Sequence, residues 1–284
     1  MPYGLFLAPY GRIVPFFQVM HSLLSPEHRE VHMRLISLLH IAPTLAAFFG
    51  VPLESSKRPV EQLLAFLQAR EPSVVTLVVI DSLDSPLYCA LASDLEVLHE
   101  LASAGLVFDC ETVTDTTTPA IASILTGLLP EEHGILTSKE VGTSPVNSLL
   151  ELLDDRGKPT GAILETAGTR PLVGRISYVC PVDDREDIAE YDALITTYTV
   201  STVQKEEVRF IFAHLRAIDR FAHRNKDLHI AAHLTNKHMV EIAAAVSARA
   251  GVLLICGDHV AHLAENRKAK RKMMGTVPLI AGYP

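Results

Sequence analysis

Three apolar runs of this chain are each followed by side chains of the kind that bind metal ions. The runs 74–80, 208–215 and 252–256 are rich in Val, Ile and Leu, which is typical of buried β-strands. In open α/β sheets, ligand-binding groups gather beyond the carboxyl ends of the strands, so we expect these side chains to lie together. The candidate ligands are Asp81, Asp219, His223, Asp258, His259 and His262.

Short apolar runs alternate with helical patterns from about residue 74 onward. Leucines at 87, 91, 95 and 98 recur at helical spacing, and Gly105 is expected to end that helix. Such alternation predicts the α/β class, as a three-layer sandwich with a mostly parallel central sheet. The predicted strands are 74–80, 106–113, 161–164, 176–179, 208–214, 252–256 and 277–281.

Residues 1–70 differ from the rest, because their pattern is mostly helical. Val31, Leu35, Leu38 and Leu39 fall on one helical face, and 43–50 reads as a short helix between Pro and Gly. We expect this segment to pack on the sheet, so that residues 1–284 form a single domain. The stretch 136–205 has room for at most a small cap. Two arginines near its middle, Arg170 and Arg175, are interpreted as surface charges, with a phosphate contact as the alternative.

Composition limits the binding partners and the cellular compartment that we expect for this protein. The formal charge of −8, from 25 basic and 33 acidic residues, gives no support for nucleic acid as a stable partner. A basic cluster at 267–272 is interpreted as a solvated loop, with attraction of anionic substrates as the alternative. Four separated cysteines indicate buried free thiols and a reducing compartment. The first residues lack a signal-peptide pattern, and no uncharged apolar run approaches about 18 residues. A cytoplasmic protein without a membrane partner is therefore expected.

The candidate ligands suit divalent metal ions, although each signal has a simpler explanation. Asp81 could cap a turn, and Asp219 with His223 could be a surface pair four residues apart on a helix. Taken together, three strand ends with such groups favour a metal site, and six ligands are enough for two ions. Carboxylate oxygens and imidazole nitrogens suit zinc, with manganese as the alternative.

A threonine cluster, 116–118, precedes Pro119 and supplies a possible nucleophile. Pro119 favours a helix start, and the N–H groups of a helix N-terminus bind anions. A threonine hydroxyl reacts only when a base or a metal activates it. We assign the chemistry to Thr117 and the capping of the helix to Thr118.

Four motifs resemble the alkaline phosphatase superfamily, and most closely its branch of nucleotide pyrophosphatases and type I phosphodiesterases. VVIDSLD resembles the first metal-binding Asp motif, and TTTPAIASILTGLLPEEHGI resembles the nucleophile segment. HLRAIDRFAH resembles the D-x-x-x-H metal motif, and CGDH resembles the S/G-D-H motif. They occur in family order between residues 74 and 262.

The resemblance implies a division of the ligands between two metal ions. Asp81, Thr117, Asp258 and His259 would surround one ion, while Asp219, His223 and a third histidine would hold the other. Thr117 would attack phosphorus to form a phosphothreonine, which water then hydrolyses.

Two departures from the family pattern concern the metal site. The third histidine of the family lies well downstream of the Asp-His pair, whereas here that role falls to His262. The residue after Asp258-His259 is a valine instead of the usual glycine.

A third departure concerns the order of segments along the chain. Residues 41–52 resemble a segment that follows the last metal ligand in family members, which implies a circular permutation. His40, just before this segment, is a remote alternative for the missing ligand.

The resemblance therefore implies a metal-dependent hydrolase of phosphate esters, either diesters or monoesters, acting on a small phosphorylated substrate. A sulfatase is disfavoured, because the nucleophile segment lacks a Cys-x-Pro site. The alternative is a degenerate, non-catalytic member of the same fold that acts as a binding or scaffolding module. The sequence carries no signal for an oligomeric state.

Overall fold

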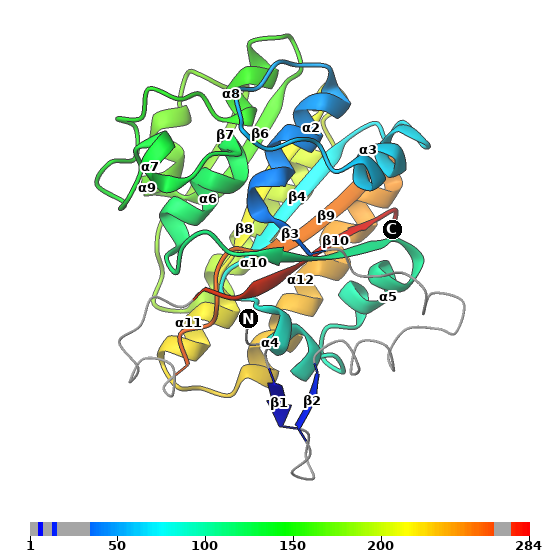
Figure 1. Ribbon diagram of the computed structural model, residues 1–284, viewed down its shortest axis with the longest axis vertical. Coiled ribbons are helices and arrows are strands. Elements are labelled where there is room, and N and C mark those ends of the chain that lie inside the picture. The colour runs from blue at the N-terminus through cyan, green and yellow to red at the C-terminus, as the bar shows by residue number, and fades with distance from the viewer. Residues whose placement is uncertain (1–4, 8–12, 16–34, 264–273) are drawn as a thin grey trace.

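The computed structural model describes residues 5–7, 13–15, 35–263 and 274–284, and its centre is one eight-stranded sheet (Figure 1). The strands of this sheet are β3 (Leu35–Ser37), β4 (Val75–Ile80), β5 (Leu106–Glu111), β6 (Thr160–Glu165), β7 (Tyr178–Val182), β8 (Phe210–Leu215), β9 (Val252–Gly257) and β10 (Thr276–Gly282). Their spatial order is β3-β5-β10-β9-β4-β8-β6-β7. Two short strands, β1 (Leu5–Leu7) and β2 (Ile13–Pro15), pair antiparallel with each other.

Only β10 runs against the other strands of this sheet, so the prediction of a mostly parallel sheet is confirmed. The central strand β4 is buried along its whole length, because it lies between β8 and β9 and is covered on both faces. Its last residue, Ile80, is in register with Leu215 of β8 and Gly257 of β9. The chain therefore leaves these three strands at the same level of one sheet edge.

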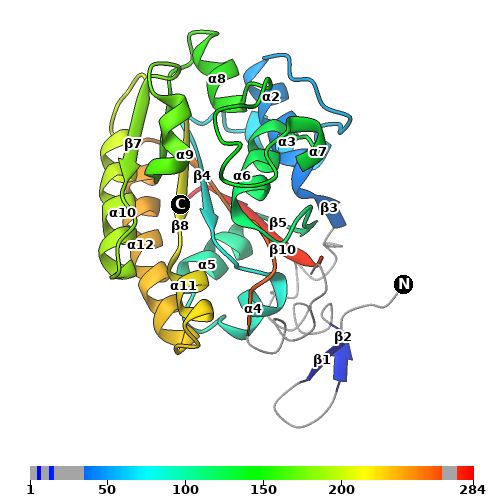
Figure 2. The same cartoon turned by 90° about the vertical axis from the view of Figure 1, so that its left-hand side faces the viewer.

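Helices cover both faces of the sheet and complete the three layers (Figure 2). Side chains alternate along β4, so Val78 and Ile80 join one apolar core while Leu77 and Val79 join the other. The first face carries α4 (Ser85–Ala90), α5 (Glu96–Ala104), α10 (Ile188–Val203), α11 (Ala217–His223) and α12 (Leu228–Ala248). The second carries α2 (Ile41–Phe49), α3 (Glu61–Gln68), α6 (Thr117–Thr126) and α8 (Leu149–Asp154), near α7 (Pro130–His133), α9 (Thr166–Thr169) and the 3-10 turn η3 (Arg170–Leu172).

The helix predicted after Asp81 is divided into two. Asp84, not Ser85, caps α4, since its carboxylate accepts a hydrogen bond from Leu87 N at 2.8 Å. A turn at 91–95 then separates α4 from α5. Leu91 and Leu95 are nevertheless buried, because the turn keeps both of them on the core side.

The N-terminal segment is less helical than its sequence pattern predicts. Leu35, expected on a helix face, begins strand β3, which pairs in parallel with β5 and is followed by the 3-10 turn η2 (Leu38–His40). Edge pairing thus overrides the helical spacing. Val31 lies outside the described residues. The short helix at 43–50 is confirmed as α2, which Gly50 ends with a φ of +69°. It packs against α6 and α8, and the circular permutation stays a prediction.

The stretch 136–205 is not a small cap. Strands β6 and β7 within it extend the central sheet beyond β8, and α10 covers that part of the sheet. Their apolar side chains are used in the main core, and the surface connections around them include the loop 134–148 and the α9–η3 turn. None of the helices in the described parts of the chain is both long and apolar enough to cross a membrane.

Gly257 lets the end of β9 approach the loop after β4, because a Cβ atom there would overlap the carbonyl oxygen of Leu83. We expect Gly257→Ala to lower the free energy of unfolding by about 2 kcal/mol, as measured by urea denaturation. Gly174→Ala is the matched control, since no atom lies within 4 Å and only its φ of +77° opposes a side chain. An equal loss in the two variants would contradict the close approach.

Candidate functional site

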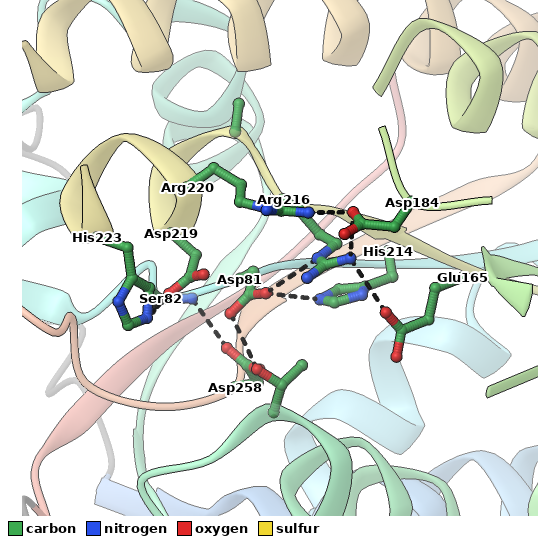
Figure 3. A network of polar contacts seen from close by, with 12 residues as sticks. Asp81, Ser82, Glu165, Asp184, His214, Arg216, Asp219, Arg220, His223 and Asp258 are labelled. Atoms are coloured by element: carbon green, nitrogen blue, oxygen red, sulfur yellow. Dashed lines mark hydrogen bonds and ion pairs between the residues drawn. The ribbon is translucent and has the colours of Figure 1, made fainter. Parts of the chain in front are cut away.

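The ends of β4, β8 and β9 bring four of the predicted ligands into one buried cluster, and Figure 3 labels three of them, Asp81, Asp219 and Asp258. Asp81 directly follows β4, Asp258 and His259 follow β9, and Asp219 lies in α11 just after β8. Their exposed fractions are 1%, 0%, 1% and 7%, respectively. The His259 Nε2 atom lies 3.3 Å from Asp81 Oδ1 and 3.6 Å from Asp258 Oδ2. Residues up to 178 positions apart in the sequence therefore form one site, since 259 − 81 = 178.

Ser82 links two of the three carboxylates, those of Asp258 and Asp219. Its backbone N–H donates to Asp258 Oδ1 at 3.0 Å, and its hydroxyl donates to Asp219 Oδ1 at 2.8 Å. To reach both, Ser82 adopts a left-handed backbone with a φ of +63°. This left-handed conformation is unfavourable for a residue with a Cβ atom, and such residues cluster at functional sites.

Two sets of three ligands are arranged closely enough to hold a cation. The ligand atoms of Asp81, Asp219 and His259 all lie within 4.8 Å of one another, and so do those of Asp81, His214 and Asp258. Asp81 belongs to both sets, so two ions bound here would share or adjoin its carboxylate.

His223 and His262 lie beside this cluster rather than inside either set. The His223 Nε2 atom is 3.3 Å from Asp219 Oδ1, and the rings of His223 and His262 are 5.2 Å apart. The ring of His262 is also 5.0 Å from that of His259, and its Nε2 atom contacts Asp115 O at 2.9 Å. His40, the remote alternative, instead contacts Arg58 O at 2.9 Å and is not brought to the cluster.

Thr117 lies at the edge of the cluster, at the start of α6. Its hydroxyl oxygen is 3.1 Å from His259 Nε2 and 3.4 Å from Asp81 Oδ1. The prediction that Thr118 caps this helix is wrong. Thr116, with an extended backbone, is the N-cap and Thr117 is the first helical residue, so α6 begins two residues earlier than predicted. The first N–H groups of α6 thus belong to Thr117 and Thr118.

Burial and like charge strongly shift the pKa values in the cluster. Burial and the neighbouring Asp258 raise the pKa of Asp81 to about 7, and burial also raises the pKa of Asp258. For His259, burial alone would lower the pKa, but the charges of Asp258 and Asp81 raise it to about 10. Burial and the charges of His259 and His223 lower the pKa of His262.

The residues present fit bound divalent cations. Asp81 Oδ2, Asp258 Oδ2 and both ring nitrogens of His214 are buried without a hydrogen-bond partner. Buried polar atoms of this kind are rare, and an ion is one of the partners that satisfies them. A cation would also offset the repulsion among the three carboxylates.

His214 and Arg216 belong to the site although the sequence analysis did not select them. His214 Nε2 is 3.6 Å and Arg216 Nε is 3.7 Å from Asp81 Oδ2, both too long for a hydrogen bond. Burial, followed by the charge of Arg216, lowers the pKa of His214 well below its usual value. The sequence could have identified His214 as a site residue, because His214, like Asp81, is a polar residue at the end of an apolar run.

Arg216 is held by charges on both sides. Its guanidinium is 3.0 Å from Glu165 Oε2 and 3.5 Å from Asp184 Oδ1 (Figure 3). Arg220 pairs with the same Asp184. The backbone N–H groups of Arg216 and Ala217 donate to the buried Asp192 at 2.9 and 3.0 Å, which fixes the turn from β8 into α11.

A pocket of about 120 Å³ opens from the cluster along α6. Thr117 and His214 line its inner end. Its outer parts are formed by α8, the end of β6, η3 and the loop 134–148. Arg175, interpreted from sequence as a surface charge, lines this pocket and pairs with Glu151 at 2.6 Å, whereas Arg170 is exposed and is not part of the lining.

The chain is similar to known proteins in part of its sequence and in its fold. Residues 75–139, which include Asp81 and Thr117, match the type I phosphodiesterase / nucleotide pyrophosphatase family. The fold resembles that of a protein in the alkaline phosphatase superfamily from Vibrio parahaemolyticus, with a TM-score of 0.56 and 12% identity over 74% of this chain and 60% of that one. The chain therefore has an alkaline-phosphatase-like fold.

Two further solved structures share this superfamily fold. A putative sulfatase from Bacteroides thetaiotaomicron has a TM-score of 0.59 at 14% identity, over 75% of this chain and 64% of that one. Phosphonoacetate hydrolase from Sinorhizobium meliloti has a TM-score of 0.52 at 16% identity, over 66% of this chain and 57% of that one. The chain thus spans less than two thirds of the length of these structures. No curated protein matches it in sequence.

The raised pKa of Asp81 predicts a pH dependence for the metal-free protein. An unfolded Asp releases its proton near its usual pKa of 3.8, whereas folded Asp81 holds it to about pH 7. The folded state therefore binds more protons across this window, and stability falls as the pH rises from about 4 to about 7. The free energy of unfolding of Asp81→Asn should therefore fall less than that of the wild type between about pH 4 and pH 7, by on the order of 2 kcal/mol. Urea denaturation at several pH values, with chelator present, measures this difference.

The control for this measurement is Asp155→Asn, at an exposed position on the end of α8. It is expected to follow the wild-type pH dependence. If Asp81→Asn did the same, Asp81 would not be the group responsible.

Proposed function

We propose that this protein is a metal-dependent hydrolase of phosphoric esters, either monoesters or diesters, with Thr117 as its nucleophile. The observation that carries the proposal is the position of the Thr117 hydroxyl. It lies at the first residue of α6, 3.1 Å from His259 Nε2 and 3.4 Å from Asp81 Oδ1. A hydroxyl beside buried ligands and a helix N-terminus meets the needs of phosphoryl transfer.

We further propose that two divalent ions, zinc or manganese, bind the cluster. Asp81, Asp258 and His259 would hold one ion near Thr117, while Asp219, His223 and His262 would hold the other. His214 is available to the first, since it forms a compact set with Asp81 and Asp258. Bound ions of this type lower the pKa of a coordinated hydroxyl or water and stabilise negative charge on phosphoryl oxygens.

The residues of the chain would divide the reaction into two displacements. In the first, Thr117 Oγ1 releases its proton to water and forms a bond to phosphorus, the bond from phosphorus to the leaving oxygen breaks, and the leaving oxygen takes up a proton from water and departs as the alcohol. Asp81 Oδ1 and His259 Nε2 orient the hydroxyl, and the N–H groups of Thr117 and Thr118 face the phosphoryl oxygens. In the second, water attacks phosphorus, the bond to Thr117 Oγ1 breaks, and inorganic phosphate or a phosphomonoester is released.

The identity of the nucleophile supports a phosphoric rather than a sulfuric ester. Cys110 and Cys256 are buried within strands β5 and β9, and no cysteine lines the pocket beside Thr117. The net charge of −8 supports a small phosphorylated compound rather than nucleic acid as the substrate. A cytoplasmic location stays a prediction.

Removal of the nucleophile should abolish hydrolysis. We expect Thr117→Ala to lower kcat/KM for 4-nitrophenyl phosphate esters by about a thousandfold or more, because no covalent intermediate can form. The control is Thr118→Ala, which keeps the backbone N–H and should lose less than about tenfold. Acid quenching during turnover should trap a phosphorylated Thr117 peptide in the wild type. A Thr117→Ala variant as fast as the wild type would disprove the assignment.

Metal content tests the two-ion site independently of any substrate. After incubation with zinc, elemental analysis should give about two ions per wild-type chain and about one per His262→Ala chain. His40→Ala is the matched control and should keep both ions, because His40 contacts Arg58 O instead of the cluster. Absence of tightly bound metal in the wild type would favour the alternative, a non-catalytic binding or scaffolding module.

A further inference from the structure

We propose that the pocket beside Thr117 selects phosphoric esters with an apolar, alkyl-like organic group over nucleoside esters. The inference rests on the proposed function, because it concerns the substrate of the same site. Thr117 and His214 form the inner end of the pocket, so a phosphoryl group at Thr117 would leave its organic substituent pointing along α6.

The walls of the pocket are mainly aliphatic. Six of the apolar side chains are contributed by four separate segments, namely α6, the loop 134–148, β6 and η3. Burial of each methylene against such walls is favourable by about 0.8 kcal/mol, which corresponds to roughly a fourfold gain in affinity. The six are Ile121, Leu125, Ile135, Val146, Leu164 and Leu172.

The charged groups of the pocket are already paired within the protein. Arg175 is 2.6 Å from Glu151 Oε1 and donates to Asn147 Oδ1 at 2.8 Å. Glu165 is 3.0 Å from Arg216. Arg175 is the only Arg or Lys among the described lining residues. The described lining therefore offers no unpaired cationic side chain to bind a second phosphate group.

The described lining also lacks the side chains that usually recognise a base. It contains no Phe, Tyr or Trp, although proteins commonly stack bases on aromatic rings. The ring of His214 is at the inner end, beside Thr117, where the phosphoryl group would lie. A nucleoside would therefore place its base against aliphatic walls without a stacking partner.

The test is a series of 4-nitrophenyl phosphodiesters whose second ester group is methyl, butyl, hexyl or octyl, with thymidine 5′-(4-nitrophenyl phosphate) as the nucleoside member. For the zinc-loaded full chain, kcat/KM should rise by up to about fourfold per methylene until the pocket is filled. The octyl ester should exceed both the methyl and the thymidine ester at least tenfold. A flat series, or a preference for the thymidine ester, would overturn the proposal.

Two variants test whether this pocket is responsible. Ala122→Trp would fill the pocket from α6, and Val146→Thr would add a hydroxyl with little change of shape. Each should lower the octyl-to-methyl ratio of kcat/KM several-fold. Ala193→Trp is the matched control, since Ala193 is exposed on α10, across the sheet from the pocket, and it should leave the ratio unchanged. An unchanged ratio in both pocket variants would contradict the proposal.

Direct binding separates this inference from the proposed hydrolysis. If the wild type hydrolyses none of the esters, the proposed function fails, but calorimetry with octylphosphonate and methylphosphonate still tests the pocket. Octylphosphonate should bind the zinc-loaded chain at least tenfold more tightly, and Ala122→Trp should remove this difference. Equal affinities for the two phosphonates would overturn the pocket assignment whether or not the protein is a hydrolase.

Discussion

The accumulation of buried carboxylates at one sheet edge is the constraint on which the rest of the site depends. Asp81, Asp219 and Asp258 are almost completely removed from water, yet they lie close enough to repel one another. His259 offsets part of this charge, and the two hydrogen bonds from Ser82 fix the positions of two carboxylates. A site of this charge and geometry is suited to divalent cations, which would supply the compensation that the protein lacks.

The parallel sheet is what makes such an accumulation possible. Because β4 lies in register between β8 and β9, side chains that follow all three strands emerge at one level. Apolar burial in the cores on the two faces of the sheet stabilises these strands. This stabilisation offsets the unfavourable burial of charge at the strand ends. This region contains both backbone strain, in the left-handed conformation of Ser82, and buried nitrogens without hydrogen-bond partners, in the ring of His214.

The site draws its parts from both faces of the sheet, and these parts have different tasks. Asp219 and His223 come from α11, on the face that α10 and α12 cover, and they supply candidate metal ligands. Thr117 comes from α6, on the opposite face, together with the pocket walls. The sheet therefore fixes the geometry of the candidate ligands, while the pocket walls are formed in part by the loop 134–148 and η3, and loops of this kind tolerate sequence change more readily than the elements they connect.

The sequence alone determined the fold class, seven of the strands in the central sheet and the set of polar residues at their ends, since apolar periodicity and motif spacing are local properties. It could not determine that Leu35 would join a strand, because edge pairing with β5 is a tertiary contact. Only the tertiary structure brought His214 and Arg216 beside Asp81, and only it showed the aliphatic pocket. Such features depend on distances between segments far apart in the chain, which burial and strand register decide.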